Sequence, residues 1–227
     1  MRLDRLRIQS TDPTRLCEWY QSLFGLNAPA DSETAEDATP TVELGESTIE
    51  LTTAESTSPV HIAFRLLCEP DAAREWLAER STILPVEGHS SRYFEFLDAT
   101  AIYFEDPEHN VLEALCYAGD SRPPTASRQN RIDGITEIGL PAREPLALVE
   151  WLEETVGLSA WGSPSETFAW VGNRDARFVV VPADRPWYPT DRTAALTPIS
   201  VRLSSTATEA GRYQHPSLPY EIIVQQQ

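Results

Sequence analysis

Polar and apolar residues alternate along this chain with two different periods, and each change of period marks the border of a secondary-structure element. Alternation with period two predicts a strand at residues 3–10 because successive strand side chains point to opposite faces. Apolar positions three and four apart then predict a helix. Asp12-Pro13 supplies its N-cap and first helical residue, and Gly25 supplies its stop. Short strands are predicted at 41–44 and 48–52, after a polar loop at 29–40.

The same order of elements follows a second time. A strand is predicted at 60–67 and a helix at 70–80. Three strands are expected after that helix, near 84–87, 92–97 and 100–105, followed by the strand that bears Glu113.

The pattern then begins again after a polar, proline-bearing stretch. Residues 119–130 are expected to be a linker between an N-terminal half, 1–118, and a C-terminal half, 131–227. Trp19, Gly25 and Leu26 recur 132 residues later as Trp151, Gly157 and Leu158, which indicates an internal repeat. The second half is abridged, because the residues after Ser204 leave no room for a further helix with all its strands.

A carboxylate interrupts the apolar run of the last strand in the first half. Glu113 shares a strand face with Val111 and Leu115. Burying a bare carboxylate is very costly, so this group must be solvated, paired with an arginine or bound to a metal ion. The pattern of this strand alone does not distinguish among these three interpretations.

The charge balance restricts the possible partners. The chain has 35 acidic and 18 basic residues, all of the latter arginine, and a formal charge of −17. Such a surface repels nucleic acid and anionic membranes. It is also typical of a protein from a salt-rich cytoplasm, where screening weakens repulsion among carboxylates. The three cysteines, Cys17, Cys68 and Cys116, form no CxxC motif and are expected to be reduced thiols of a cytoplasmic protein. No apolar stretch is long enough for a membrane span, and no signal core is found in the first ten residues.

Four motifs together resemble the vicinal oxygen chelate superfamily, which includes glyoxalase I, extradiol dioxygenases and fosfomycin- and bleomycin-resistance proteins. They are DPTRLCEWYQSLFGL, STIELT, HIAF and YFEDPEHNVLEAL, in that order between residues 12 and 115. The resemblance implies an α+β fold of tandem βαβββ units. Their open, curved mixed sheets would have the helices outside and a metal site in the cleft.

The resemblance also implies positions for the metal ligands. They fall on Arg5, Glu50, His61 and Glu113, of which Glu50, His61 and Glu113 can bind a divalent ion such as Mn, Fe, Co, Ni or Zn. Arg5 cannot, because a guanidinium has no lone pair to offer. The alternative is that Arg5 neutralises Glu50 or Glu113 and a salt bridge replaces the metal. In the second half the equivalent positions, Glu137, a valine near Val179, Pro198 and Glu221, make a poor site, and this half is expected to be a structural buttress or a homodimer surface.

The expected function is that of a metal-dependent enzyme of the glyoxalase or extradiol dioxygenase class that chelates vicinal oxygens of an anionic small molecule. In such an enzyme Tyr103 would orient the substrate and Glu50 or Glu113 would act as base. Arg5, Arg7 and Arg65, on the inward strand faces, would bind the anion. A metal-free protein that sequesters a small molecule on the same fold is the alternative.

Overall fold

The computed structural model describes residues 1–26, 39–121 and 131–226. Most of the expected loop at 29–40 and of the expected linker at 119–130 lies outside these residues. The helices are α1 (Pro13–Phe24), α2 (Pro70–Ala78) and α3 (Pro145–Trp151), the last continued by a π-helical turn, η2 (Leu152–Val156). None of the helices in these ranges has the length and apolar character needed to cross a bilayer.

The strands are β1 (Arg2–Ser10), β2 (Thr41–Leu44), β3 (Ser47–Thr53), β4 (His61–Leu66), β5 (Thr82–Leu84), β6 (Arg92–Phe94), β7 (Ala99–Glu105), β8 (Val111–Tyr117), β9 (Ile132–Ala142), β10 (Ala160–Trp161), β11 (Ala169–Gly172), β12 (Arg177–Pro182), β13 (Ile199–Ser205), β14 (Gly211–Gln214) and β15 (Tyr220–Gln226).

The helix ends follow from local chemistry. The Asp12 carboxylate accepts a hydrogen bond from the Arg15 amide at 3.1 Å and so caps α1, and Gly25 ends that helix in the left-handed conformation at φ 66°. Gly157 ends η2 in the same way at φ 83°. These caps and stops agree with the sequence prediction.

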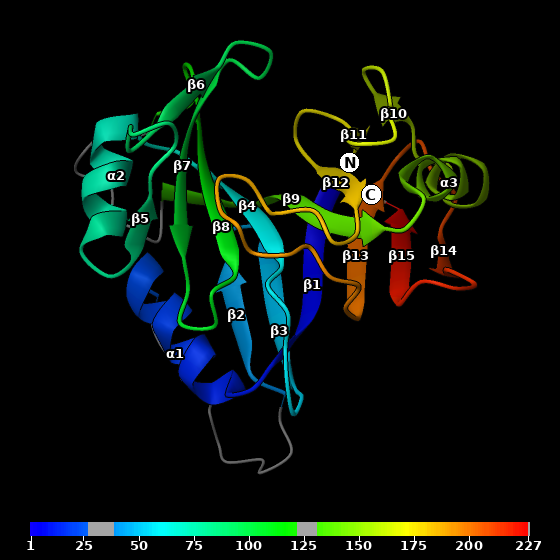
Figure 1. Ribbon diagram of the computed structural model, residues 1–227, viewed down its shortest axis with the longest axis horizontal. Helices are drawn as coiled ribbons and strands as arrows, with labels where there is room; N and C mark the ends of the chain where they lie inside the picture. The colour runs from blue at the N-terminus through cyan, green and yellow to red at the C-terminus, as the bar shows by residue number, and fades with distance from the viewer. Residues whose placement is uncertain (27–38, 122–130, 227) are drawn as a thin grey trace.

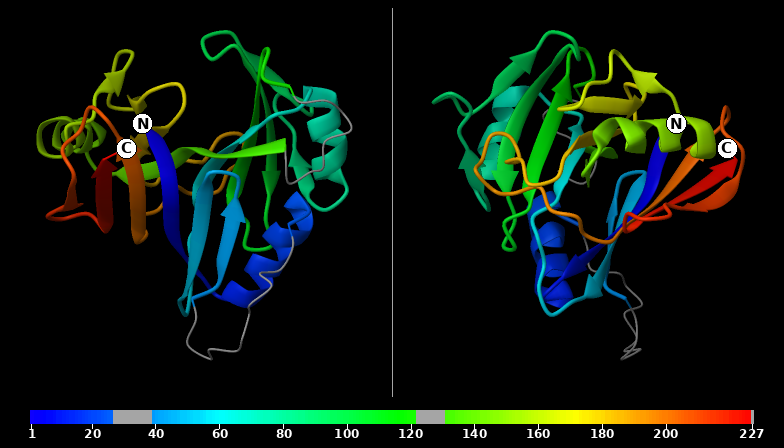
Figure 2. Two further views of the ribbon diagram at one scale, coloured as in Figure 1. Left: turned by 180° about the vertical axis from the view of Figure 1, so that it is seen from behind. Right: turned by 45° about the vertical axis from the view of Figure 1, so that its right-hand side comes forward.

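Four repeated units build one open mixed sheet, as the α+β prediction required. The first unit is β1–α1–β2–β3, the second runs from β4 to β8 around α2, and the third runs from β9 to β12 around α3 and η2. The fourth consists of β13, β14 and β15, and no helix lies between β13 and β14, so the second half is abridged as expected. The helices lie at the outer flanks of the molecule, α1 and α2 on one side and α3 on the other (Figures 1 and 2).

Pairing between units does not follow their order along the chain. β4 of the second unit pairs antiparallel with β9 of the third, and β1 of the first unit pairs antiparallel with β13 of the fourth. The inner units two and three therefore share one curved surface, with strand order β7-β8-β4-β9-β12-β11, and the outer units one and four share another.

Two apolar clusters cover opposite faces of these strands. The larger lies between sheet and helices and includes an aromatic group of Tyr20, Phe24, Phe64 and Trp76, with ring centroids 5.3 to 6.3 Å apart. The smaller lines the concave face of units two and three and contains Ala63, Tyr103, Val179 and Trp187. The second cluster is interrupted by charged side chains, and these form the candidate site.

Candidate metal centre

One row of residues crosses the concave face of units two and three. Ala63 on β4 lies in register with Glu113 on β8 and with Glu137 on β9. Glu137 is in turn level with Arg177 on β12, and Glu113 with Tyr103 on β7. Residues level with one another on adjacent strands share a face, so both carboxylates project over the small Ala63 side chain.

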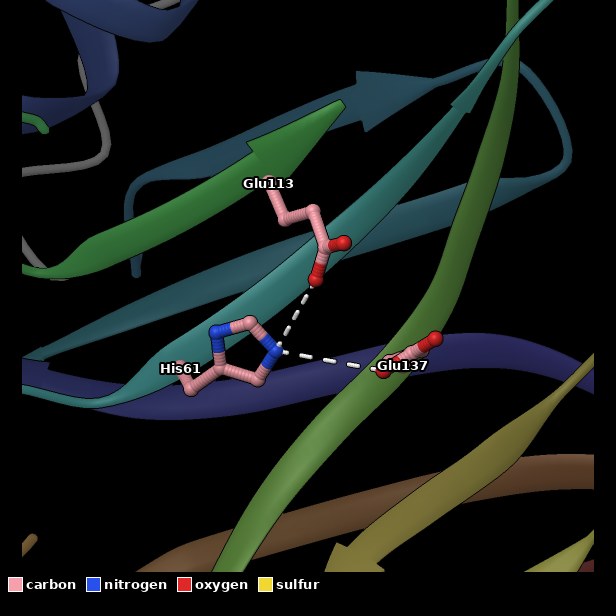
Figure 3. A group of neighbouring side chains, drawn as sticks. All are labelled: His61, Glu113 and Glu137. Atoms are coloured by element: carbon pink, nitrogen blue, oxygen red, sulfur yellow. Dashed lines mark ion pairs between the residues drawn. The ribbon is translucent and has the colours of Figure 1, made fainter. Parts of the chain in front are cut away.

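His61 completes the group because it lies two residues before Ala63 and so shares that face. Its Nε2 atom lies 3.5 Å from Glu113 Oε2 and 3.9 Å from Glu137 Oε2 (Figure 3). One ligand atom from each of the three side chains lies within 4.8 Å of the others, and all three residues are buried. A nitrogen and two carboxylate oxygens converging at this spacing form a candidate metal centre.

The imidazole of His61 is held in one orientation. Its Nδ1 lies 3.1 Å from the Val111 carbonyl oxygen, to which it donates, so Nε2 is the atom that faces the carboxylates. This arrangement of one ring nitrogen on a backbone carbonyl is typical of metal-binding histidines. The ring also lies 5.5 Å, centroid to centroid, from Trp187, whose indole Nε1 donates to the Pro59 carbonyl at 2.9 Å.

Trp187 reaches His61 because β9 carries a glycine at the point of contact. A Cβ atom on Gly139 would lie 2.4 Å from the Trp187 ring. Any side chain at this position would push the indole away from the imidazole. The glycine therefore has a packing role in the site.

The two carboxylates have different proton affinities. Burial and the nearby charge of Glu137 raise the pKa of Glu113 to about 7. Burial also opposes ionisation of Glu137, but hydrogen bonding to His61 and the charge of Arg177 outweigh it and lower the pKa of Glu137. For His61, burial opposes the charged ring, but Glu137 and Glu113 outweigh it and raise its pKa. Without a metal ion, these shifts favour a proton on His61 and on Glu113, and a bound cation could replace those protons.

Arg177 positions Glu137. Its side chain is fully buried, and its Nη2 forms an ion pair with Glu137 Oε1, which leaves Oε2 directed at His61. Nη1 donates to the Arg174 carbonyl at 2.8 Å and to the Tyr117 hydroxyl at 3.2 Å. The guanidinium also lies over the rings of Trp161 and Trp170, at 5.2 and 5.3 Å from their centroids. The two oxygens of Glu137 thus have separate partners.

The group opens into a pocket of about 370 Å³. The pocket is lined by His61, Arg92, Phe94, Leu97, Tyr103, Glu113, Glu137, Phe168, Trp170, Val179, Val181, Arg185, Trp187 and Tyr188. Aromatic and aliphatic walls with a few convergent polar groups are typical of small-molecule sites.

The expected grouping of Glu50 with His61 and Glu113 is not found. Glu50 accepts from Arg5 Nη1 at 2.5 Å and from Arg7 Nε at 2.8 Å, on the surface shared by units one and four. The salt bridge between Arg5 and Glu50, predicted as the alternative to a metal ion, is present there. The physical reason is the pairing of units. β1 pairs with β3 and β13, whereas β4 pairs with β8 and β9.

The expected anion-binding arginines also lie elsewhere. Arg65 forms ion pairs with Asp120 at 2.5 Å and with Asp175 at 3.2 Å. The pocket is not lined by Arg65, Arg5 or Arg7. Tyr103 does line the pocket, beside Glu113. Burial, together with the charge of Glu113, raises the pKa of Tyr103 well above its usual value, so its hydroxyl stays protonated and able to donate.

Sequence reasoning missed Glu137 as a member of the group. The internal repeat placed it at the position of Arg5, and the second half was therefore expected to be structural. The signal was present, because Glu137 is a carboxylate at a ligand position of the repeat. Pairing the second unit with the third would have put it beside His61. The site spans both halves of the chain.

The overall architecture matches solved proteins with very different sequences. A "putative dioxygenase" from Bacillus subtilis matches with a TM-score of 0.61 at 13% identity, covering 99% of this chain and 85% of that one. Glyoxalase I from Zea mays matches with a TM-score of 0.54 at 12% identity, covering 98% of this chain and 91% of the maize enzyme. The chain has the vicinal oxygen chelate fold. No protein-family model and no curated protein matches the sequence.

The vicinal oxygen chelate fold explains why the group lies where it does. Repeated units that pair through their first strands bring the first and last strands of both units to one concave face. In this chain the inner pair of units carries His61, Glu113 and Glu137 there. The outer pair carries Arg5, Arg7 and Glu50, whose charges are already paired.

Proposed function

We propose that this protein is a divalent-metal-dependent enzyme that binds a small molecule through two neighbouring oxygen atoms, in the manner of the glyoxalase and dioxygenase classes. One observation carries the proposal. His61, Glu113 and Glu137 converge within 4.8 Å at the buried wall of a pocket large enough for a small molecule. With three protein ligands, further coordination positions stay available to substrate and water.

The side chains present fit a divalent ion. The lone pair of His61 Nε2 is exposed to the ion once its proton is displaced, and the lowered pKa of Glu137 keeps that carboxylate ionised. One nitrogen and two oxygen ligands suit Mn, Fe(II), Co, Ni or Zn. A bound divalent ion would act as a Lewis acid and stabilise negative charge on substrate oxygen.

The chain's own residues could supply the proton transfers. Glu113, whose pKa is about 7 in the absence of a metal ion, could leave the metal to accept and return a proton near neutral pH. We assign it the base role that the sequence left open between Glu50 and Glu113, because Glu50 is held by two arginines. The protonated Tyr103 hydroxyl, which borders the pocket beside Glu113, would donate a hydrogen bond to substrate oxygen and so orient it.

Metal analysis of protein purified without chelator tests this proposal. Wild-type protein should contain about one equivalent of divalent metal, and His61→Ala and Glu137→Gln should each lose most of it. His109→Ala is a matched control, because His109 also faces a carboxylate but is exposed and outside the pocket. Glu50→Gln should keep the metal. Metal-free wild-type protein whose melting temperature does not change with Mn²⁺, Fe²⁺ or Zn²⁺ would refute the proposal.

A metal-free binding protein is the second candidate, and one observation favours it. Arg177 already neutralises Glu137, as Arg5 and Arg7 neutralise Glu50 on the other surface. A cluster compensated by arginine and protons can be stable without a cation. For this function, the pocket should bind its ligand equally well with and without EDTA.

A further inference from the structure

Arg185 contributes a cation to the pocket and has no acidic partner among the described residues. It lies in the loop between β12 and β13 and lines the pocket. Its Nη1 donates to the Thr167 carbonyl at 2.8 Å and its Nε to the Pro186 carbonyl at 3.3 Å. No carboxylate within residues 1–26, 39–121 or 131–226 forms an ion pair with it. Partial burial lowers the pKa of Arg185, and within the described part of the chain no acidic group offsets that effect.

The other arginines near the pocket are paired. Arg92 contacts Glu87 at 2.9 Å, Arg177 is paired with Glu137, and Arg192 with Glu105. In a chain with 35 acidic residues and 18 arginines, acidic partners are abundant. A partly buried guanidinium held only by carbonyl groups therefore has its charge available for a ligand.

The walls beside Arg185 suit a flat apolar group. Phe168 and Trp170 meet edge to face, with ring centroids 5.1 Å apart, on one wall. Tyr103 and Tyr188 meet edge to face at 5.5 Å on another. The indole Nε1 of Trp170 is sealed from solvent and has no hydrogen-bond partner in the described part of the chain. Flat rings stack well against such walls, and a saturated chain of equal size does so less well.

We propose that the pocket selects a flat, unsaturated acid and that Arg185 binds its anionic group. Arg185 is then a specificity-determining residue. This inference rests on the proposed function, which places the reacting oxygens of the substrate at the metal centre. It adds how the protein recognises the remaining part of the substrate. A bound divalent ion would balance Glu113 and Glu137, so the positive charges of Arg177 and Arg185 would further favour an anionic ligand.

Binding of two matched probes tests the inference. 2-Naphthoate carries a flat ring and a carboxylate, and 2-naphthalenemethanol carries the same ring without the charge. Quenching of tryptophan fluorescence would give both dissociation constants for wild-type protein, Arg185→Gln, Arg185→Lys and Arg212→Gln. Arg212 is an exposed arginine on β14, outside the pocket, and serves as the control.

We expect Arg185→Gln to weaken 2-naphthoate binding at least about tenfold, as loss of a charge-assisted hydrogen bond predicts. The neutral probe should bind wild type and Arg185→Gln equally. Arg185→Lys, which keeps the charge, should retain most of the affinity, and Arg212→Gln all of it. Equal affinity of wild type and Arg185→Gln for 2-naphthoate, or no binding of it by wild type, would overturn the inference.

Repeating the titrations in EDTA and in His61→Ala separates this inference from the metal-dependent function. An effect of Arg185→Gln that persists there supports anion binding by Arg185 even if no metal is found. Stoichiometric metal together with an absent Arg185 effect would leave the proposed function standing and refute the inference alone.

Discussion

Replacing Arg177 by methionine should strongly destabilise the metal-free protein. The ion pair between Arg177 and Glu137 is sealed from solvent, with side-chain exposures of 0% and 5%. Removing one partner of a buried pair leaves the other charge unpaired and costs roughly 3–5 kcal/mol. For a chain of this size, a loss of about 4 kcal/mol corresponds to a fall in melting temperature of roughly 10 °C.

The loss of stability in Arg177→Met should depend on both the Glu137 carboxylate and the bound metal ion. Arg177→Met combined with Glu137→Gln removes both charges and should recover much of the stability, because replacing a buried pair is far less costly than breaking it. A divalent ion at one hundred times its dissociation constant contributes about 2.7 kcal/mol. It would also compensate Glu137, so the deficit of Arg177→Met should be smaller with the ion than in EDTA.

Urea unfolding followed by circular dichroism, in EDTA and in Mn²⁺, measures these differences. Arg212→Met is the matched control, because Arg212 forms an arginine–glutamate pair with Glu221 that is exposed to water, and its midpoint should hardly change. If Arg177→Met in EDTA cost no more than this control, or if the double variant were as unstable as the single one, the buried-charge argument would be refuted.

Four further outcomes follow from the structure. Because the Glu113 carboxyl has a pKa of about 7, a metal ion that binds at lower pH must displace its proton. Metal titrations at pH 6, 7 and 8 should show the affinity for the ion falling as the pH falls. A pH-independent metal affinity would contradict the assignment of Glu113 as a ligand. Burial raises the pKa of Asp106 from its ordinary 3.8 to about 6, so the folded state holds this proton more tightly than the unfolded chain does. Its contribution to the free energy of unfolding should fall by about 2 kcal/mol between pH 4 and pH 7, and the urea midpoints of Asp106→Asn should lack that slope. Gly139→Ala should lower the free energy of unfolding in urea by about 1–3 kcal/mol, because the added Cβ meets the Trp187 ring. Adding Trp187→Leu should reduce this loss of stability. An unchanged urea midpoint for Gly139→Ala would show that the indole is not confined. If the charge of −17 reflects a salt-rich cytoplasm, the melting temperature should fall markedly below about molar salt, where the Debye length exceeds roughly 3 Å. Full stability in dilute buffer would exclude that origin.

Much of the fold could be predicted because its signals are local. The cap at Asp12 and the glycine stops at Gly25 and Gly157 act within a few residues, and the structure contains all three. Strand periodicity likewise identified which residues of β4 and β8 share a face, and the resemblance to the vicinal oxygen chelate superfamily implied that His61 and Glu113 face the cleft. The repeat of 132 residues indicated the number and order of the units.

The candidate site could be predicted only in part, because its last member depends on which units pair. His61 and Glu113 lie on parallel strands of one unit, and their closeness follows from the unit itself. Glu50 lies on the last strand of the first unit and Glu137 on the first strand of the third, and no local signal shows which of the two carboxylates joins His61. Glu50 instead lies between Arg5 and Arg7 because β3 pairs with β1.

By itself, the amino-acid sequence determined the repeated α+β units and which residues of each strand share a face, since periodicity and capping act over a few residues. Two of the three candidate metal ligands came from its resemblance to the vicinal oxygen chelate superfamily. Only the tertiary structure decided that β4 pairs with β9. That pairing brings Glu137 to His61, beside the pocket that Arg185 also lines. Such contacts join strands far apart in the chain, and their choice depends on which curved surfaces bury the most apolar area together, a property of the whole molecule.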